Sequence, residues 1–515
     1  MPAYDAVVIG AGHNGLVCAA YLARAGLSVV VLERSDRIGG ACVTEELFEG
    51  FRMSTAAPGL SLMRPEIVRE LGLKLDIRPA DPLAFTPFED GGGLSLWRDD
   101  AQRRKAIAEV SAADAEADGR FRGLFQEAAA ILRPLLSYPA TRRHVRRAFG
   151  KSDVEDLFAK TVDGSIADVC EEYFESDVMQ GLMASQGIIG SAAGPRTAGT
   201  AYIYLHHASG TITGRPGERA FVNGGMGAVT KQLADVVLAA GGEIRVEAEV
   251  SSVTLDGHRR PSGVVLTSGE EIEAHTVCSN ADPKRTVALF PGGSLPDDFV
   301  AEVDVLPTAG TVVKVNCALG ALPAFKGMSQ SSTPGPEHLG IITIAPSIAY
   351  LETACNEAAE GRPASNMFCE AWIETAGEPE LAPDGKHTLS VSAQYAPYEL
   401  AEGTWDERRD QIGDQVIGTL ARYAPGLPEL IEDRDVMGPL DLERRFSLTG
   451  GNIFHGELLP DWLFDARPTH AWHRHRLPIA GTYLCGSGAH PGGAVSGGPG
   501  RLAARAVLED LVARG

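Results

Sequence analysis

Several common features are scarce or absent in this sequence of 515 residues. No apolar run approaches the roughly 20 residues that cross a bilayer, so we predict no membrane span. Acidic residues outnumber basic ones by 68 to 46, which gives a formal net charge of −22. Such a chain argues against nucleic acid as a partner and against general attraction to anionic membranes.

The eight cysteines include no pair with the CxxC spacing. This excludes a disulfide framework, a zinc ribbon and the redox-active dithiol of the disulfide reductases, and we predict no metal site. We expect buried, reduced thiols in a cytoplasmic protein. The first residues, MPAYDAVVIG, lead directly into a strand without a basic lead or a small-residue cleavage site, so we expect no signal or transit peptide.

Motifs of several enzyme classes are also missing. The chain has no GxSxG, no HExxH and no second complete GxGxxG, because GSGAHPG breaks that last pattern at Pro491. We therefore expect no separate nicotinamide domain. Hydrophobic residues make up 44% of the chain and charged residues 22%, as in ordinary globular proteins, and the length suffices for two or three domains.

Residues 4–34 have the pattern of a dinucleotide-binding βαβ unit. An apolar strand at residues 7–9 precedes GAGHNG, residues 10–15, and a helix is predicted from about residue 14 to residue 25. Gly26 ends that helix, and a second strand at 29–32 leads to Glu33. The order strand, glycines, helix, strand and acid is specific for this fold.

Each part of this unit has a physical role. Gly10 permits the tight turn, Gly12 lets the backbone approach a pyrophosphate, and Gly15 lets the helix pack against the strand. The amides at the helix N-terminus attract phosphate. We therefore predict that the whole loop binds the cofactor, that is Gly10, Ala11, Gly12, His13, Asn14 and Gly15.

Glu33 distinguishes among nucleotide cofactors. A carboxylate at this position accepts hydrogen bonds from ribose hydroxyls, which favours FAD or NAD over NADP, although Arg34 follows directly. The glycine pair Gly39-Gly40, followed by Ala41, would continue the backbone contacts past the ribose of a long cofactor. This points to FAD.

Near the C-terminus, residues 486–500 read GSGAHPGGAVSGGPG, between a strand-like GTYLC and a helix-like RLAARAVLEDLV. Here the sequence resembles a known family. ERSDRIGGACVTEELFEGFRMS (33–54), GGMGAVTKQLADVVLAAGGEIRVEAEVSSV (224–253), SNADP (279–283), LTGGNIFHGEL (448–458) and the C-terminal glycine-rich stretch are similar to flavoproteins of the phytoene desaturase and amine oxidase superfamily. The similarity is greatest to the phytoene desaturase-like branch that includes carotenoid ketolases and pyridine nucleotide-disulfide oxidoreductase domain-containing proteins.

The resemblance implies an α/β architecture, with a Rossmann-like FAD-binding domain of the glutathione reductase and amine oxidase type and an inserted α+β substrate domain. The FAD domain would be discontinuous, comprising residues 1–80, 220–295 and 440–515. The substrate domain would comprise 81–219, predicted to be mainly helical around RFRGLFQEAAAILRPLL, and 296–439. Within the FAD domain we predict a helix after Gly224–Gly227, a strand at 244–250, a turn at Asp256-Gly257 and strands at 264–266 and 272–278.

The resemblance also assigns cofactor contacts. Val250 would contact the adenine end through its backbone, and the C-terminal turn would lie under the flavin ring. A helix beginning near Ala494 would direct its N-terminus at the ring and stabilise negative charge on it. Ser487 stands where the wider superfamily often has an acidic residue. The predicted contacts of this turn are Gly486, His490, Gly492, Gly493, Ala494 and Val495.

Lys314 is the candidate catalytic residue. It lies in the apolar strand TVVKVNCAL, where an unsolvated ammonium is costly. The stretch resembles the amine oxidase strand whose lysine holds a water near flavin N5. The alternative is a lysine that extends to solvent from a sheet edge.

Histidines and an asparagine could border the substrate pocket. His206 and His207 could line it or be packed or surface residues, and Asn452 and His455 could border it or be turn residues. His473 and His475 are expected in an exposed loop. A cluster of basic residues could face a membrane beside a substrate entrance or could pair with local acids: Arg133, Arg142, Arg143, Arg146, Arg147 and Lys151.

The resulting hypothesis is an FAD-dependent oxidoreductase acting on an apolar or extended substrate by hydride transfer to flavin N5, as in carotenoid desaturation or ketolation. Electrons would pass to oxygen, a quinone or a carrier. An amine oxidase-like enzyme is an alternative, although aromatics at 6% do not favour an aromatic-caged amine site. Others are a flavin-loaded structural partner and a non-redox binding protein of the GDP dissociation inhibitor type. We expect a cytoplasmic location, with peripheral membrane contact as an option.

Overall fold

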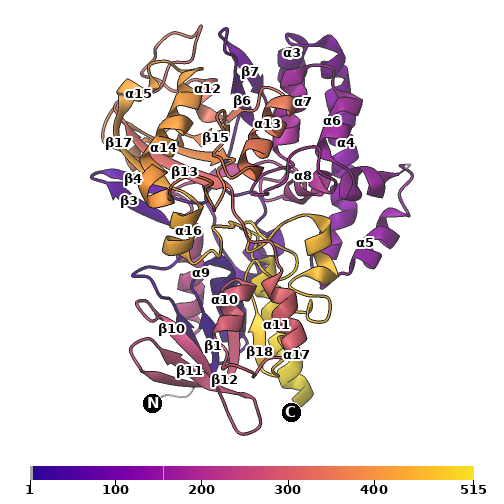
Figure 1. Cartoon of the computed structure of the whole chain (residues 1–515), viewed down its shortest axis with the longest axis vertical. Helices are drawn as coiled ribbons and strands as arrows, with labels where there is room; N and C mark the ends of the chain where they lie inside the picture. The colour runs from indigo at the N-terminus through magenta and orange to yellow at the C-terminus, as the bar shows by residue number, and fades with distance from the viewer. Residues whose placement is uncertain (1–3, 155, 515) are drawn as a thin grey trace.

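The computed structural model describes residues 4–154 and 156–514. Two seven-stranded sheets organise these residues. The first sheet, with both chain termini, occupies the lower part of Figure 1, and the second sheet with most of the helices occupies the upper part.

The first sheet has the strand order β10-β11-β12-β1-β2-β9, with β18 also paired to β12. Neighbours are parallel from β18 through β12, β1 and β2 to β9, whereas β10, β11 and β12 are antiparallel. The strands are β1 (Tyr4–Ile9), β2 (Val29–Leu32), β9 (Glu243–Arg245), β10 (Val250–Leu255), β11 (Pro261–Leu266), β12 (Glu271–Ser279) and β18 (Thr482–Leu484).

Successive apolar residues of β1 and β2 point to opposite faces of the first sheet, so each face has its own hydrophobic core. Val8 and Val31 pack with the helices on one face, whereas Val7 and Val30 pack on the other face with residues of β10, β11 and β12. This period of two is the geometry of a strand buried on both faces. The helices of this half are α1 (His13–Arg24), α2 (Pro65–Leu71), α9 (Gly227–Ala239), α10 (Pro283–Ala288), α11 (Asp297–Asp304), α16 (Pro439–Phe446) and α17 (Gly498–Arg514).

The predicted strand-helix-strand start is confirmed as β1, α1 and β2. The hairpin of β11 and β12 is also where it was expected. The single strand predicted at 244–250 is wrong, because β9 ends at Arg245 and β10 begins only at Val250. Between them the amides of Glu247 and Ala248 donate to the carbonyls of Ser35 and Glu33, so the chain turns towards the end of β2.

The second sheet has the order β17-β13-β16-β15-β14-β6-β7. The strands of this sheet lie within the segments predicted for the substrate domain. The strands of the first sheet lie within the segments predicted for the FAD domain. The exact domain boundaries stay a prediction. The strands are β6 (Ala84–Pro87), β7 (Gly93–Leu96), β13 (Val312–Leu319), β14 (Ile341–Ile344), β15 (Phe368–Trp372), β16 (His387–Gln394) and β17 (Ile431–Met437).

Helices surround this second sheet in the upper half of Figure 1. The helix predicted around residues 120–136 lies within the long helix α4, which is capped by the Ser111 hydroxyl. The principal helices are α3 (Asp100–Ala108), α4 (Ala112–Leu135), α5 (Arg142–Phe149), α6 (Ile166–Tyr173), α7 (Asp177–Ser185), α8 (Thr200–Ala208), α13 (Ile348–Ala359) and α14 (Trp405–Ala421).

The basic cluster lies at the end of α4 and on α5. Arg142 pairs with Asp163 and Asp461, and Arg146 also approaches Asp163. Arg143, Arg147 and Lys151 are exposed. Part of the cluster therefore pairs with local acids, and membrane contact stays a prediction. Among residues 4–154 and 156–514, we find no helix with the length and apolar character to cross a membrane.

Candidate cofactor and substrate site

A hollow of about 710 Å³ lies where the parallel strands of the first sheet end; we call it the strand-end hollow. Its size is within the range of about 300–1,000 Å³ typical of small-molecule sites. Parallel sheets bind ligands at this edge, because the loops after the strands diverge there. The predicted residues that line it are Gly10, Gly12, His13, Asn14, Glu33, Arg34, Gly39, Gly40, Ala41, Val250 and His455.

The glycine loop is packed too tightly for side chains. A methyl group on Gly15 would lie 2.1 Å from the carbonyl oxygen of Gly10, and one on Gly12 would lie 2.8 Å from Nδ2 of Asn280. Asn280, in the segment SNADP, also lines the hollow. Gly15 therefore serves the contact between α1 and β1, as predicted, and Gly12 leaves bare backbone at the hollow.

Glu33 fixes this loop to the end of β2. Its Oε2 accepts a hydrogen bond of 2.8 Å from the Ala11 amide, and its Oε1 accepts one of 3.0 Å from the Ser35 amide. The Gly39 amide donates to the Ala11 carbonyl at 3.0 Å, which joins the second glycine pair to the first loop. Ribose contact by Glu33 stays a prediction.

Four buried polar atoms of residues that line the hollow have no hydrogen-bond partner within the described chain. They are Nε2 of His13, Oδ1 of Asn14, Nε of Arg285 and Nδ1 of His455. Burial lowers the pKa of both His13 and His455 to about 4, so both rings are neutral at pH 7. Because orphaned buried polar atoms are costly, this arrangement indicates a ligand with polar groups.

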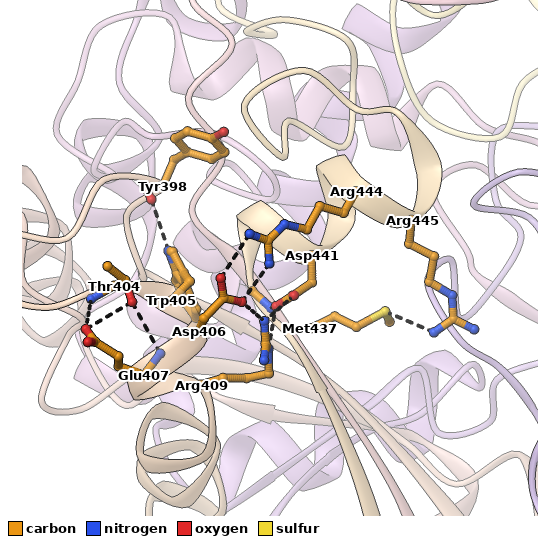
Figure 2. Close-up of polar contacts among 11 residues, drawn as sticks. Tyr398, Thr404, Trp405, Asp406, Glu407, Arg409, Met437, Asp441, Arg444 and Arg445 are labelled. Atoms are coloured by element: carbon orange, nitrogen blue, oxygen red, sulfur yellow. Dashed lines mark hydrogen bonds and ion pairs between the residues drawn. The ribbon is translucent and has the colours of Figure 1, made fainter. Parts of the chain in front are cut away.

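Helix α16 carries part of the hollow's wall and is held from outside by an ion-pair network (Figure 2). Asp406, at the start of α14, pairs with Arg409 and with Arg444 of α16. Arg409 also pairs with Asp441 of α16. On the inner side Arg34 donates to the carbonyls of Arg444 and Arg445, both at 2.7 Å.

We expect Asp406→Asn to speed the release of the predicted FAD. Arg444 and Arg409 hold the pKa of the Asp406 carboxyl below its ordinary value. The stabilisation that ionised Asp406 gives the folded protein is therefore complete above the unfolded pKa of about 3.9, and it is lost as pH falls through the lower folded pKa. Stopped-flow flavin fluorescence at neutral and acidic pH measures the release rate. Because the network is exposed, salt at molar concentration should screen it and bring the release rate of the wild type close to that of the variant.

Asp410→Asn is the matched control, since Asp410 lies one turn further along α14 and has no ion pair among the described residues. Equal release rates from Asp406→Asn and wild type at low salt would show that the network does not hold α16.

A second cavity, of about 200 Å³, adjoins the strand-end hollow and reaches the second sheet; we call it the Lys314 cavity. Both are lined by His13, Ala41 and Ser487. Most of its wall is apolar, including Phe368, Trp372 and Phe454. The two cavities therefore lie side by side between the glycine loop and the second sheet.

Lys314 lies in β13, between β16 and β17, so the sheet-edge interpretation is wrong. Its side chain is buried, with Nζ donating to the Ser390 hydroxyl at 2.9 Å and the Ser392 hydroxyl at 3.1 Å. Burial lowers the pKa of Lys314 to about 7, against the attraction of Glu374 and Glu370. Lys314 can therefore change protonation state near neutral pH, a property of residues that transfer protons.

A chain of hydrogen bonds positions Lys314. The Ser390 hydroxyl donates to Oδ1 of Asn316 at 2.9 Å, and Nδ2 of Asn316 donates to the Thr55 carbonyl at 3.0 Å. Residues directly after Thr55, Ala56 to Gly59, line the same cavity. The lysine is thus fixed relative to the cavity wall.

The predicted pocket histidines separate into different environments. His207 lines the Lys314 cavity, whereas Nε2 of His206 contacts the Gly493 carbonyl at 3.2 Å. Burial lowers the pKa of His207 well below its ordinary value. Oδ1 of Asn452 accepts from the amides of Phe454 and Gly456, so it is a turn residue.

The C-terminal stretch differs from the prediction. Helix α17 begins at Gly498, so the start predicted near Ala494 is wrong. Gly492, Ala494 and Gly497 have positive φ angles, which a helix cannot contain. Ala494 and Val495 line the Lys314 cavity.

The other residues of this stretch lie against protein. A methyl group on Gly493 would lie 2.4 Å from the Phe454 ring, one on Gly492 would lie 3.2 Å from Leu458, and one on Gly486 would lie 2.5 Å from the Asn280 carbonyl. The His490 ring contacts the Leu135 carbonyl at 3.3 Å.

His475 was expected in an exposed loop, and that expectation is wrong. It is buried, and its Nδ1 lies 3.1 Å from the Leu484 carbonyl of β18. His473 is half-buried and contacts the His470 carbonyl. Sequence reasoning also missed Glu370 and Arg219. Glu370 is a lone carboxylate in the apolar strand FCEAW, the same signal that identified Lys314.

Comparisons with known proteins bear on this geometry. The family model described as flavin containing amine oxidoreductase matches residues 15–508. Pyridine nucleotide-disulfide oxidoreductase domain-containing protein 2 of Rattus norvegicus is 38% identical, over 99% of this chain and 94% of the rat protein. A limonene dehydrogenase subunit of Castellaniella defragrans is 26% identical, over 98% and 95%. The lycopene-forming phytoene desaturase of Pseudescherichia vulneris is 25% identical, over 98% and 99%.

Among solved structures, wild-type putrescine oxidase bound to putrescine matches with a TM-score of 0.59 at 18% identity, over 99% of each chain. This likeness shows the fold. The predicted α/β fold class and the resemblance to phytoene desaturase-like flavoproteins are both confirmed by these matches.

Proposed function

Because the chain belongs to the flavin containing amine oxidoreductase family, whose cofactor is FAD, we propose that it dehydrogenates an apolar or extended organic substrate. The observation that carries this proposal is the largely apolar Lys314 cavity, which adjoins the strand-end hollow and shares His13, Ala41 and Ser487 with it. Carotenoid-like desaturation, which removes hydrogen from a carbon-carbon bond, is the specific form that we favour.

The residues around the strand-end hollow fit FAD. Bare backbone at Gly10 and Gly12 suits a pyrophosphate, and the unpartnered atoms of His13 and Asn14 suit a polar ligand. Glu33 and Val250 would hold the adenosine end, whereas Ala41, Ala494, Val495 and Lys314 would border the ring. Bound FAD supplies the redox chemistry by accepting a hydride at N5.

The chain's own residues would orient the substrate and handle a proton. Phe368, Trp372 and Phe454 would exclude water from an apolar substrate. Lys314, fixed by Ser390 and Ser392, would hold or release a proton at Nζ beside the substrate.

The charges in the cavity favour an uncharged substrate over an amine. Glu370 supplies the carboxylate among its lining residues, and Arg219 already pairs with it at 2.7 Å. With Lys314 also present, a cationic ammonium group has no unpaired carboxylate there. The limonene dehydrogenase and phytoene desaturase relatives support an uncharged substrate that is largely hydrocarbon, whereas putrescine oxidase shares only the fold.

The test begins with the chromophore released when the purified protein unfolds, which we expect to be FAD. Anaerobic bleaching of the flavin is then followed with limonene and phytoene as hydrocarbons and with putrescine and benzylamine as amines. Reduction by a hydrocarbon supports the proposal, and reoxidation by air or by a quinone then identifies the class of electron acceptor.

Bleaching by amines alone would instead assign an amine oxidase. FAD that no substrate reduces, together with stable co-purification of one protein, would indicate a structural partner. A colourless protein that refuses added FAD would overturn the oxidoreductase proposal in favour of a non-redox binding protein.

A further inference from the structure

One row of side chains on the second sheet is polar from strand to strand. Lys314 of β13 pairs in register with Ser392 of β16, Ser392 pairs with Glu370 of β15, and Glu370 pairs with Thr343 of β14. Residues directly opposite one another share a face of the sheet. The row therefore leads from the Lys314 cavity towards β14.

A further chamber, of about 160 Å³, lies at the far end of this row; we call it the outer chamber. Thr343 and Glu370 line it, together with apolar residues that include Phe125, Met183 and Ile341. Arg103, Arg122 and Glu218 also line it, and each is already ion-paired, with Asp118, Asp118 and Arg98 respectively. It adjoins the Lys314 cavity along four shared residues. These four form what we call the neck: Ser61, His207, Arg219 and Glu370.

The charged groups at the neck are mutually satisfied. Nη1 of Arg219 donates to Oε2 of Glu370 at 2.7 Å, and Nε2 of Gln186 donates to Oε1 of Glu370 at 2.9 Å. Arg219 also donates to the side-chain oxygen of Gln186, which closes a ring of three side chains. A charged ligand at the neck would have to compete with this buried ion pair.

Unlike Arg219 and Glu370, His207 has a polar atom at the neck that no described residue satisfies. Its side chain lines both cavities, and its buried Nδ1 has no hydrogen-bond partner among the residues that the structure describes. A hydroxyl or carbonyl group of a ligand could satisfy this atom, according to the tautomer of the ring. An uncharged group would do so without disturbing Arg219 and Glu370.

We propose that the neck and outer chamber are a second part of the substrate site. The outer chamber takes the apolar tail of an elongated substrate, and an uncharged hydroxyl or carbonyl group of that substrate bonds His207 at the neck. This inference rests on the proposed function, because it assumes an organic substrate in the Lys314 cavity.

The test measures binding of four probes to the FAD-loaded protein by calorimetry and by perturbation of the flavin absorbance. The probes are octanol, dodecanol, dodecane and dodecanoate. Dodecanol should bind at least about tenfold more tightly than octanol, because its additional methylenes enter the outer chamber. Dodecanol should also bind more tightly than dodecane or dodecanoate.

Two variants separate the chamber from the neck. Met183→Phe partly fills the outer chamber, so it should abolish the preference for dodecanol over octanol by weakening dodecanol, which needs more of that space, more than octanol. His207→Phe should abolish the preference for dodecanol over dodecane. If Met183→Phe does not fold, Ala208→Val narrows the same chamber from α8.

Arg215→Gln is the matched control, since Arg215 is exposed, lies four residues before Arg219 and lines neither cavity. Equal affinities for octanol and dodecanol in the wild type, or equal losses for both in Met183→Phe, would overturn the inference. If dodecanoate bound most tightly of the four probes, the inference that the neck selects an uncharged group would be overturned. Failure of the proposed function is distinct, because it appears as absent FAD or absent bleaching whatever the probes do.

Discussion

Replacing Lys314 with methionine should lower kcat by about 10²–10⁴-fold while the protein keeps its FAD, since positioned proton-transfer groups contribute about that much. Methionine has a similar length but cannot hold a proton, and Ser390 and Ser392 would lose their donor. The rate of anaerobic flavin bleaching, with a substrate identified by the screen, measures the effect.

The same variant should be more stable than the wild type at acidic pH. The folded pKa of Lys314 is about 7 and its unfolded pKa is about 10.4, so between these values the unfolded chain binds more protons. Wild-type stability therefore rises with pH across that window, and the methionine side chain removes this dependence. Urea unfolding at about pH 6 and about pH 9 should show the advantage of the variant shrinking as pH rises.

Lys231→Met is the control, because Lys231 is exposed on α9 and pairs with Asp235. It should change neither the bleaching rate nor the pH dependence of unfolding. A Lys314→Met protein with wild-type kcat would remove Lys314 from the chemistry, and one with an unchanged pH dependence of stability would show that its native pKa is ordinary.

Gly15→Ala should strip the protein of FAD and lower its thermal midpoint. The added methyl would lie 2.1 Å from the Gly10 carbonyl oxygen and 3.1 Å from Cβ of Asn280. Backbone must therefore move where α1 packs on β1, and overpacking of this kind costs about 1–3 kcal/mol or more. The ratio of flavin to protein absorbance and a thermal melt measure both effects.

Gly123→Ala is the matched control, and it should raise the stability of the folded protein where Gly15→Ala lowers it. Gly123 lies inside α4, and a methyl group there would meet nothing within 4 Å. Alanine should stabilise the helix by about 0.5–1 kcal/mol and leave the flavin content unchanged. Retention of full flavin by Gly15→Ala would contradict the tight packing of the loop.

Some parts of the candidate site could be predicted because they depend on neighbours in sequence. The loop of residues 10–15, the end of β2 at Glu33 and the pair Gly39-Gly40 all lie within about one βαβ unit of roughly 30 residues. Their spacing alone specifies a strand, a tight turn and a helix. The FAD prediction followed from that spacing and from the family resemblance, and the family match confirms it.

Other parts depended on partners that are distant in sequence. The strand of Lys314 was recognisable, but its hydroxyl partners come from β16, more than 70 residues later. Whether β13 is central or at an edge is decided by the strand order β17-β13-β16. The burial of His475 likewise follows from its contact with β18, and nothing in HAWHRHRLP indicates it.

The sequence by itself determined the cofactor class, the dinucleotide-binding start of the chain and the identity of the buried lysine, because local spacing and the cost of burying charge act along a short segment. The tertiary structure alone decided the adjacency of the two cavities, the pairing of Arg219 with Glu370 and the start of α17 at Gly498. These features arise where separate segments meet, and the free energy of packing and hydrogen bonding between them overrides local preference.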